Sequence, residues 1–314
     1  MPLGSVRLLG GAPNHDEWGY RFLWAGEFST SHADGDIITY IKSYIRDKHP
    51  LISLLLMQCD GVETTNDERA LLRSFIYNPT MFEEHVPRDT DTALIVTLAT
   101  RKVMDSRILH IPLDDESFRL GVYERLSGHI ARTPWEEKIP TVFWRGSLTG
   151  EIGENSRTRC VKLLCDSPHA DVRLTPMSWN NFATGEFADK TNTRYYAERR
   201  PTQDFVRHKY NLIIDGSCIA SSLQWTFASG SVPILVTHPG NNWWFKRYLE
   251  PMKHYVPVAY DVSDLEERLE WLVTHDEEAR AIAENAVAFS QYYLSAEFQQ
   301  YHLRCEIDAL LGGV

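Results

Sequence analysis

The segment 143–150, Phe-Trp-Arg-Gly-Ser-Leu-Thr-Gly, holds the densest group of residues whose types could do chemistry. Arg145 follows an apolar run, and its guanidinium is permanently charged and can bind phosphate oxygens in pairs. Gly146 lets a ligand approach the backbone, while Ser147 and Thr149 add hydroxyl groups. The pattern predicts a phosphate-binding turn at the end of a strand. A surface turn with an ion-paired arginine is also compatible with it.

Two further segments predict helix starts, where free N–H groups and the helix dipole favour an anion. Residues 155–159 carry Arg157 and Arg159, one of which could instead be a solvated surface charge. Residues 215–222 read as strand, turn and helix made of small residues. The candidate diphosphate ligands in this second segment are Asp215, Gly216, Ser217, Ser221 and Ser222. Close packing of a helix on a sheet would explain the same composition, and neither GxGxxG nor a P-loop is present.

Asp60 is the candidate catalytic carboxylate. It follows the apolar run 51–57, so it would lie at the end of a buried strand, where a carboxylate can act as a general base. A turn aspartate before Gly61 is the alternative interpretation. The Asp-x-Asp pairs at 34–36 and 89–91 follow no clear strand, and neither HExxH nor zinc-type cysteine spacing occurs. We therefore expect no metal ion and no cofactor.

Strands alternating with helices must position these residues, a pattern typical of α/β proteins with parallel sheets. The predicted strands cover 51–57, 93–98, 107–111, 141–144, 210–215 and 232–236. The predicted helices cover 37–46, 68–76, 117–131, 157–164, 219–228 and 296–311, and the stretch 166–204 reads as mostly loop. Two capping boxes, Ser263 with Glu266 and Thr274 with Glu277, predict two more helix starts.

A chain of 314 residues indicates two domains, because single cores rarely exceed roughly 250–300 residues. Pro134 and Pro140 would bracket the linker. The sequence thus predicts two Rossmann-like α/β domains facing a cleft, at 1–136 and 137–290. The segment 291–314 is expected to form a helix that packs back on the first domain.

Composition narrows the possible partners. The formal net charge of −11 argues against nucleic acid, which usually meets a basic surface. No apolar stretch reaches the ~20 residues of a membrane span. The five cysteines are odd in number and lack CxxC, which favours free thiols in a reducing compartment.

Four segments together resemble glycosyltransferase family 90, the family of protein O-glucosyltransferases and capsule xylosyltransferases. They are FWRGS at 143–147, HKYNLIIDG at 208–216, FASGSVPILV at 227–236, and the stretch from WWFKRYLEPMKHYVPVAYDVSDLEERLEW to IAENAVAF within 243–289. The resemblance implies a GT-B-like fold, an inverting mechanism without a metal, and UDP-glucose or UDP-xylose as donor. The acceptor would be a hydroxyl of a glycan or of a protein serine.

The resemblance also implies residue roles. The first domain would bind the acceptor, with Asp60 as base, and the second would bind the donor diphosphate through Arg145, Gly146 and Ser147. One departure is Ser222, where the family carries an arginine; Arg157 or Arg159 would have to replace that charge. A catalytically weak or inactive nucleotide- or glycan-binding module is therefore the alternative. Since neither a signal peptide nor a KDEL signal is seen in this sequence, the expected location is cytoplasmic.

Overall fold

The computed structural model describes residues 36–48, 93–101, 108–150, 153–176, 183–216 and 219–311, with the backbone alone at 46–47 and 93–95. It also describes the backbone of short strands within the first 87 residues. The chain divides into two compact units. Unit 1 comprises Met1–Arg119, Gly240–Arg247 and Ala296–Val314, and unit 2 comprises Leu120–Pro239 and Tyr248–Ser295.

Unit 2 is built on a five-stranded sheet in which every neighbouring pair is parallel. Its strands are β10 (Ile139–Ser147), β11 (Ala170–Thr175), β12 (His208–Ile214), β13 (Val232–Val236) and β15 (Val256–Val258). The spatial order is β11-β10-β12-β13-β15, so the direction of winding reverses between β10 and β12. In doubly wound sheets this reversal opens a crevice at the carboxyl ends of the two strands.

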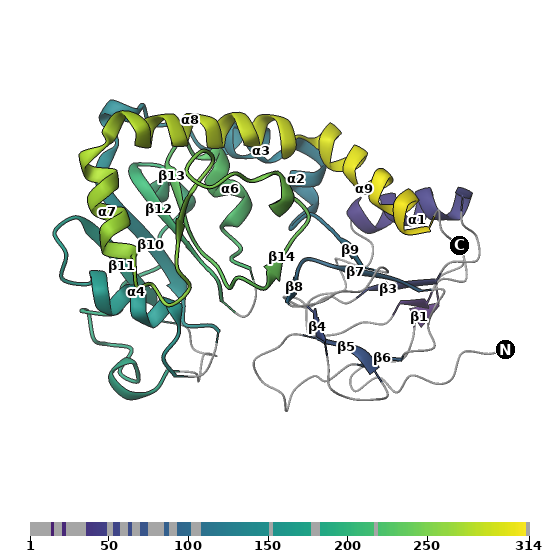
Figure 1. Ribbon diagram of the computed structural model, residues 1–314, viewed down its shortest axis with the longest axis horizontal. Helices are drawn as coiled ribbons and strands as arrows, with labels where there is room; N and C mark the ends of the chain where they lie inside the picture. Colours follow the sequence, from purple (N-terminus) through teal and green to yellow (C-terminus); the bar gives the residue numbers. More distant parts are fainter. Residues whose placement is uncertain are drawn as a thin grey trace. The chain divides into compact units, whose positions relative to one another are not determined.

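Helices cover both faces of this sheet (Figure 1). The helices α4 (Ser156–Leu164) and α7 (Leu265–Thr274) pack on the face that carries Trp144 and Leu212. The short helices α5 (Thr202–Phe205) and α6 (Leu223–Ala228) contact β12. Two further helices, α3 (Val122–His129) and α8 (Asp276–Tyr293), pack against α6. The sheet is therefore buried on both sides, as its nearly continuous apolar strands require.

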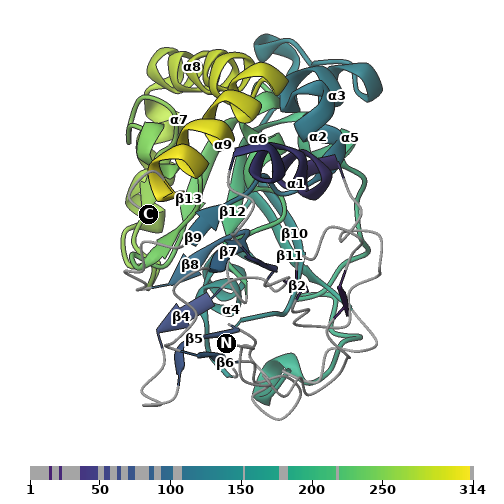
Figure 2. The ribbon, with the colours of Figure 1, turned by 90° about the vertical axis from the view of Figure 1, so that its right-hand side faces the viewer.

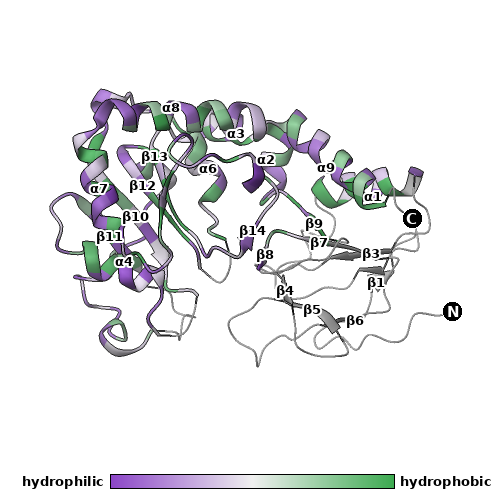
Figure 3. Ribbon diagram, in the orientation of Figure 1, coloured by the Kyte–Doolittle hydropathy of each residue, from purple (hydrophilic) through white to green (hydrophobic). Residues whose placement is uncertain are grey.

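Unit 1 contains a smaller parallel sheet in the order β3-β7-β9, formed by Ser53–Leu56, Ala93–Thr97 and Ile108–His110. Helix α1 (Asp36–Lys48) lies beside α9 (Ala296–Leu311), as Figures 1 and 2 show. Apolar residues of both helices, including Ile41 and Leu303, share one core. Helices α8 and α9 are striped with hydrophobic and hydrophilic residues, as expected of helices that bury one face (Figure 3).

The remaining strands of unit 1 are short. They are β1 (Asn14–His15), β2 (Arg21–Phe22), β4 (Val62–Thr64), β5 (Ala70–Ser74), β6 (His85–Pro87), β8 (Thr100–Arg101) and β14 (Asn241–Asn242). The last five form a mixed sheet in the order β14-β8-β4-β5-β6. Strand β14 belongs to the excursion 240–247, whose buried Trp244 contacts His302 of α9.

The α/β class with parallel sheets is confirmed, but three predicted elements are wrong. The helix expected over 68–76 is the strand β5, whose pairing with β4 and β6 outweighs its local helical spacing. The helix expected over 117–131 is two helices, α2 (Asp115–Leu120) and α3, because Gly121 between them adopts φ 89°. The stretch read as loop at 166–204 contains β11.

Neither predicted capping box forms. Helix α7 follows Asp264, and α8 follows His275; neither makes a side-chain cap bond. Thr274 instead donates to the carbonyl oxygen of Glu270, one turn back in its own helix. The residues that precede the two helices are Asp264 and His275, so each helix starts one residue later than the pattern predicts.

The two units divide the chain differently from the predicted domains. The first boundary falls at 119/120 rather than at 136/137. The supposed linker is part of unit 2, because Trp135 is buried and its Nε1 donates to Asp276 Oδ2 at 3.0 Å. The predicted C-terminal helix belongs to unit 1 through its contacts with α1. How the two units face each other stays a prediction.

In the described part of the chain, no helix is both long enough and apolar enough to span a bilayer. The expected cytoplasmic location stays a prediction.

Candidate functional site

A cavity of about 330 Å³ lies at the carboxyl edge of the unit 2 sheet, where β10, β11 and β12 end. This is the point at which the strand order reverses, the usual ligand position in such sheets. Its walls are formed by Trp144, Arg145, Gly146, Ser147, Arg157, Thr175, Arg199, Arg200, Thr202, Phe205, Ile214, Ala220, Ser221, Ser222 and Trp225. We call it the switch-point pocket.

Arg145 lines this pocket, yet most of its hydrogen-bonding capacity is used within the protein. Its Nη2 donates to Asp171 Oδ1 at 2.6 Å, and its Nη1 donates to the carbonyl oxygens of Trp144 and Asp171, both at 2.9 Å. The guanidinium also lies over the Phe143 ring, 4.8 Å from its centroid. Burial lowers the pKa of Arg145, and the bond and charge of Asp171 oppose that shift. Arg145 is therefore an ion-paired arginine, as the alternative interpretation of this motif expects, although it also lines the pocket.

Arg157 fastens the two strands that flank the reversal. Its Nη1 donates to the carbonyl oxygen of Ser147 at 2.6 Å, at the end of β10. Its Nη2 and Nε donate to the carbonyl oxygens of Ile214 (2.9 Å) and Asp215 (3.1 Å), at the end of β12. A fourth bond, 2.7 Å long, runs to Thr149 Oγ1. This guanidinium is therefore a structural clamp that also forms part of the pocket wall.

Three predicted donor ligands, Thr149, Asp215 and Gly216, do not line the pocket. Asp215 Oδ2 accepts hydrogen bonds from Thr237 Oγ1 at 2.6 Å and from the His238 N–H at 3.0 Å, which ties the end of β12 to the segment after β13. A Cβ at Gly216 would lie 2.3 Å from Thr149 Oγ1, so only glycine fits beside the Arg157 clamp. All three residues lie against Arg157, which itself lines the pocket.

Neither predicted helix start offers free N–H groups in the expected way. In α4, the Asn155 side chain accepts from the N–H groups of Arg157 and Thr158, and Thr158 Oγ1 accepts from the Asn155 N–H. This capping box satisfies the donors that an anion would use. Helix α6 begins at Leu223, four residues later than predicted, and spans six residues.

Ser221 and Ser222 therefore lie before α6, and both line the pocket. Gly146 and Ser147 line it as well, while Ser217 and Asp60 lie outside the described residues. The structure thus brings part of the predicted donor set together and leaves the predicted base untested.

The pocket has an aromatic wall that the sequence did not single out. Phe205 meets Trp225 edge-on, with ring centroids 5.3 Å apart. Trp144 lies over Gly146, where a Cβ would come within 2.4 Å of the indole ring. Flat aromatic surfaces of this kind suit a nucleobase or the apolar face of a sugar.

Arg199 and Arg200 were missed as well, because they belong to the stretch read as loop. The only local signal is a pair of adjacent cations followed by Pro201, just before the β12 strand. Their proximity to the strand ends depends on tertiary structure.

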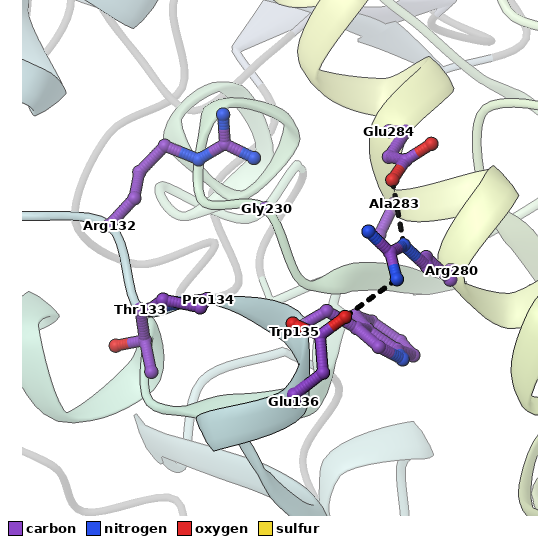
Figure 4. A pocket seen from close by; sticks show the side chains of 9 residues that line it. All are labelled: Arg132, Thr133, Pro134, Trp135, Glu136, Gly230, Arg280, Ala283 and Glu284. Carbon is purple, nitrogen blue, oxygen red and sulfur yellow. Dashed lines mark hydrogen bonds and ion pairs between the residues drawn. The ribbon is translucent and has the colours of Figure 1, made fainter.

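A second cavity, of about 290 Å³, lies at the opposite, amino edge of the same sheet. Figure 4 shows Arg280 there between two carboxylates, with bonds of 2.6 Å to Glu136 and 2.9 Å to Glu284. Arg132 lies against Gly230. With as many carboxylates as guanidinium groups, this cavity has no net charge for a diphosphate.

Within the parts of the chain whose side chains are described, no three His, Cys, Asp or Glu residues are grouped to hold a metal ion. The expectation of a metal-independent reaction is not tested by this observation.

Comparison with known proteins identifies the family. The model of glycosyl transferase family 90 matches residues 120–305, more than half of the chain. The chain therefore belongs to glycosyl transferase family 90.

Relatives share this region at moderate identity. Protein O-glucosyltransferase 2 of Danio rerio is 31% identical over 178 residues, covering 54% of this chain and 32% of that protein. The uncharacterized protein 179R of Invertebrate iridescent virus 6 is 30% identical over 193 residues, covering 52% of this chain and 16% of that protein. The chain thus spans a third or less of the length of these two relatives. Among solved structures, Anabaena HepE in complex with UDP-glucose gives a TM-score of 0.47 at 9% identity, covering 87% of this chain and 75% of that one.

Proposed function

We propose that the chain is a glycosyltransferase that transfers glucose or xylose from a UDP-sugar to a hydroxyl group of a glycan or protein. The observation that carries this proposal is the position of the switch-point pocket. It lies at the carboxyl ends of β10 and β12 and is lined by Arg145, Gly146 and Ser147, the residues that the family resemblance assigns to the donor. The name of the zebrafish relative, an O-glucosyltransferase, supports a glucose donor.

In this proposal the UDP-sugar places its uracil or ribose against Phe205 and Trp225 and its pyrophosphate beside Ser147, Ser221 and Ser222. The acceptor oxygen attacks the anomeric carbon from the face opposite to UDP, so the configuration inverts. The bond to UDP breaks with its electron pair, and the leaving diphosphate gains negative charge. Groups already positioned around it stabilise that charge, which is where enzymes gain most.

We further propose that Asp60 takes the proton of the attacking hydroxyl. A positioned base typically contributes about 10²–10⁴-fold to the rate. Positive side chains around the pocket would supply the charge that a metal ion supplies in other transferases, so we propose a metal-independent reaction.

A non-catalytic nucleotide- or glycan-binding module is the second candidate. One observation favours it: a neutral Ser222 lines the pocket where the family carries an arginine, so less charge is available for a departing diphosphate.

Incubation of the protein with UDP-glucose or UDP-xylose, with and without a chelator, tests the proposal. We expect slow release of UDP that survives chelation, transfer to added glycan acceptors, and an inverted product anomer by NMR. An Asp60→Asn variant should bind the donor normally and lose transfer. Donor binding without any turnover in the wild type would favour the binding module. Failure to bind any UDP-sugar would refute the proposed function.

A further inference from the structure

The charge balance of the switch-point pocket shows which cations remain for a ligand. Arg145 bonds one carboxylate and two carbonyl oxygens, and Arg157 bonds three carbonyl oxygens and a hydroxyl. Their donors are largely committed to protein oxygens. Both side chains also hold the local fold together, so neither can turn towards a ligand without breaking these bonds.

Arg199 and Arg200 differ from these two clamps. Both line the same pocket and both are exposed. Among the described residues, the Arg199 side chain forms no ion pair or hydrogen bond. Arg200 forms one loose ion pair with Asp204, at 3.7 Å, and its side chain is 53% exposed. Their guanidinium groups retain most of their donors.

The fold fixes the backbone on both sides of these arginines. On one side, Tyr196 is buried, its hydroxyl donates to the carbonyl oxygen of Phe187 at 2.8 Å, and the following Ala197 N–H donates to the Leu174 carbonyl oxygen of β11. On the other side, Pro201 leads into α5, whose Phe205 is buried. Only a few residues separate the two anchors, so the arginines are held at the pocket rim while their side chains stay adjustable.

We propose that Arg199, assisted by Arg200, is the principal cation that binds the donor pyrophosphate in this chain. This inference rests on the proposed function and adds the residues that recognise the diphosphate. Guanidinium groups bind phosphate oxygens in a bidentate manner, and two adjacent ones can contact both phosphates. The neutral Ser222 in the same pocket is consistent with a site whose charge comes from the 199–200 segment.

Calorimetric titration with UDP and with uridine separates the phosphate contribution from that of the nucleoside. In the wild type we expect UDP to bind more tightly than uridine, and increasingly so at low salt. The Arg199→Ala/Arg200→Ala double variant should lose about 10–100-fold in UDP affinity, the effect of charged hydrogen bonds, with uridine affinity unchanged. A structural defect would weaken both ligands.

Arg194→Ala is the matched control, because Arg194 is an exposed arginine of the same segment that pairs with Asp166 at 2.5 Å and does not line the pocket. It should retain wild-type affinity for UDP. A third variant, Ser222→Arg in the double-alanine background, should restore at least part of the lost UDP affinity, since it returns a cation to the same pocket.

The outcomes distinguish the two claims. If the double variant binds UDP as well as the wild type does, the inference is overturned while the proposed function stands. If the wild type binds neither UDP nor a UDP-sugar, the proposed function fails and this inference fails with it.

Discussion

The guanidinium of Arg145 donates to the carboxylate of Asp171 at 2.6 Å, between the neighbouring strands β10 and β11. The two side chains differ in environment: that of Arg145 is 5% exposed and that of Asp171 is 47% exposed. A buried guanidinium has lost much of its hydration, and a nearby carboxylate offsets that cost. Removing the carboxylate would leave a buried positive charge without a negative partner, which destabilises the fold. This pair therefore stabilises the pocket wall.

Asp171→Asn tests this contribution. We expect the free energy of unfolding to fall by about 1–3 kcal/mol, because a bond to a charged acceptor is replaced by a weaker one beside a buried cation. Urea denaturation provides the measurement. The control is Asp166→Asn, which removes the ion pair with Arg194; both partners there are more than half exposed. Such pairs contribute about 0–1 kcal/mol. Equal losses in the two variants would show that burial of Arg145 is unimportant.

Gly216→Ala tests the packing around the Arg157 clamp. The added methyl group would lie 2.3 Å from Thr149 Oγ1 and 2.7 Å from Arg157 Nη2, so one of the clamp bonds must break. We expect a loss of about 1–3 kcal/mol in stability, as for other overpacked sites. Gly128→Ala is the control, because nothing lies within 4 Å of its new Cβ in the exposed part of α3. That helix variant should gain up to about 1 kcal/mol.

Trp225→Ala tests the aromatic wall. If the uridine part of the donor packs on Trp225 and Phe205, the variant should bind uridine about three- to tenfold more weakly, the usual range of aromatic contacts. Calorimetry with uridine measures this directly. Tyr292→Ala removes an aromatic ring that is 63% exposed and outside the pocket, and should leave uridine affinity unchanged. Unchanged binding in both variants would exclude Trp225 from the nucleoside site.

His208 makes stability depend on pH. Burial lowers the pKa of this imidazole to about 4, and its ring stacks on Phe143 with centroids 4.3 Å apart. In the unfolded chain the pKa is about 6.5, so between pH 6.5 and 4 the unfolded state binds a proton that the folded state does not. The contribution of neutral His208 to the free energy of unfolding is therefore fully present above pH 6.5, and it is lost as the pH falls towards 4.

Urea midpoints of the wild type and His208→Gln at pH 7 and pH 4.5 measure this effect. The wild type should lose more stability than the variant over this interval, by at most about 1.4 kcal/mol per pH unit. His169→Gln, at an exposed position, should behave like the wild type. A wild-type loss equal to that of His208→Gln would contradict the role of His208.

Much of the fold could be predicted because its signals are local. The apolar runs that became β12 and β13, and the periodic helix Ala296–Leu311, appear in the structure close to their expected bounds. The segment 70–74 was misread because a strand shorter than two helical turns cannot be distinguished from a helix by spacing alone; its partners in β4 and β6 decide the outcome.

The site was harder to predict than the fold. The sequence predicted where β10 and β12 end. It could not show that the Arg157 guanidinium would donate its hydrogen bonds to three backbone carbonyl oxygens there. Those acceptors are backbone atoms and leave no trace in residue types. Arg199 was missed for the complementary reason: its segment has no periodicity, and its place at the pocket follows from contacts with β11.

The division of the chain between the units constrains its biosynthesis. The first 119 residues share a unit with α9, whose Leu303 and Ile307 belong to the same core as Ile41 of α1. During translation, the first 119 residues are made long before α9, which completes their core. The apolar side chains of α1 therefore stay without their α9 partners while residues 120–295 are synthesised. Truncation before residue 296 would remove Leu303 and Ile307 and leave the α1 side of this core uncovered.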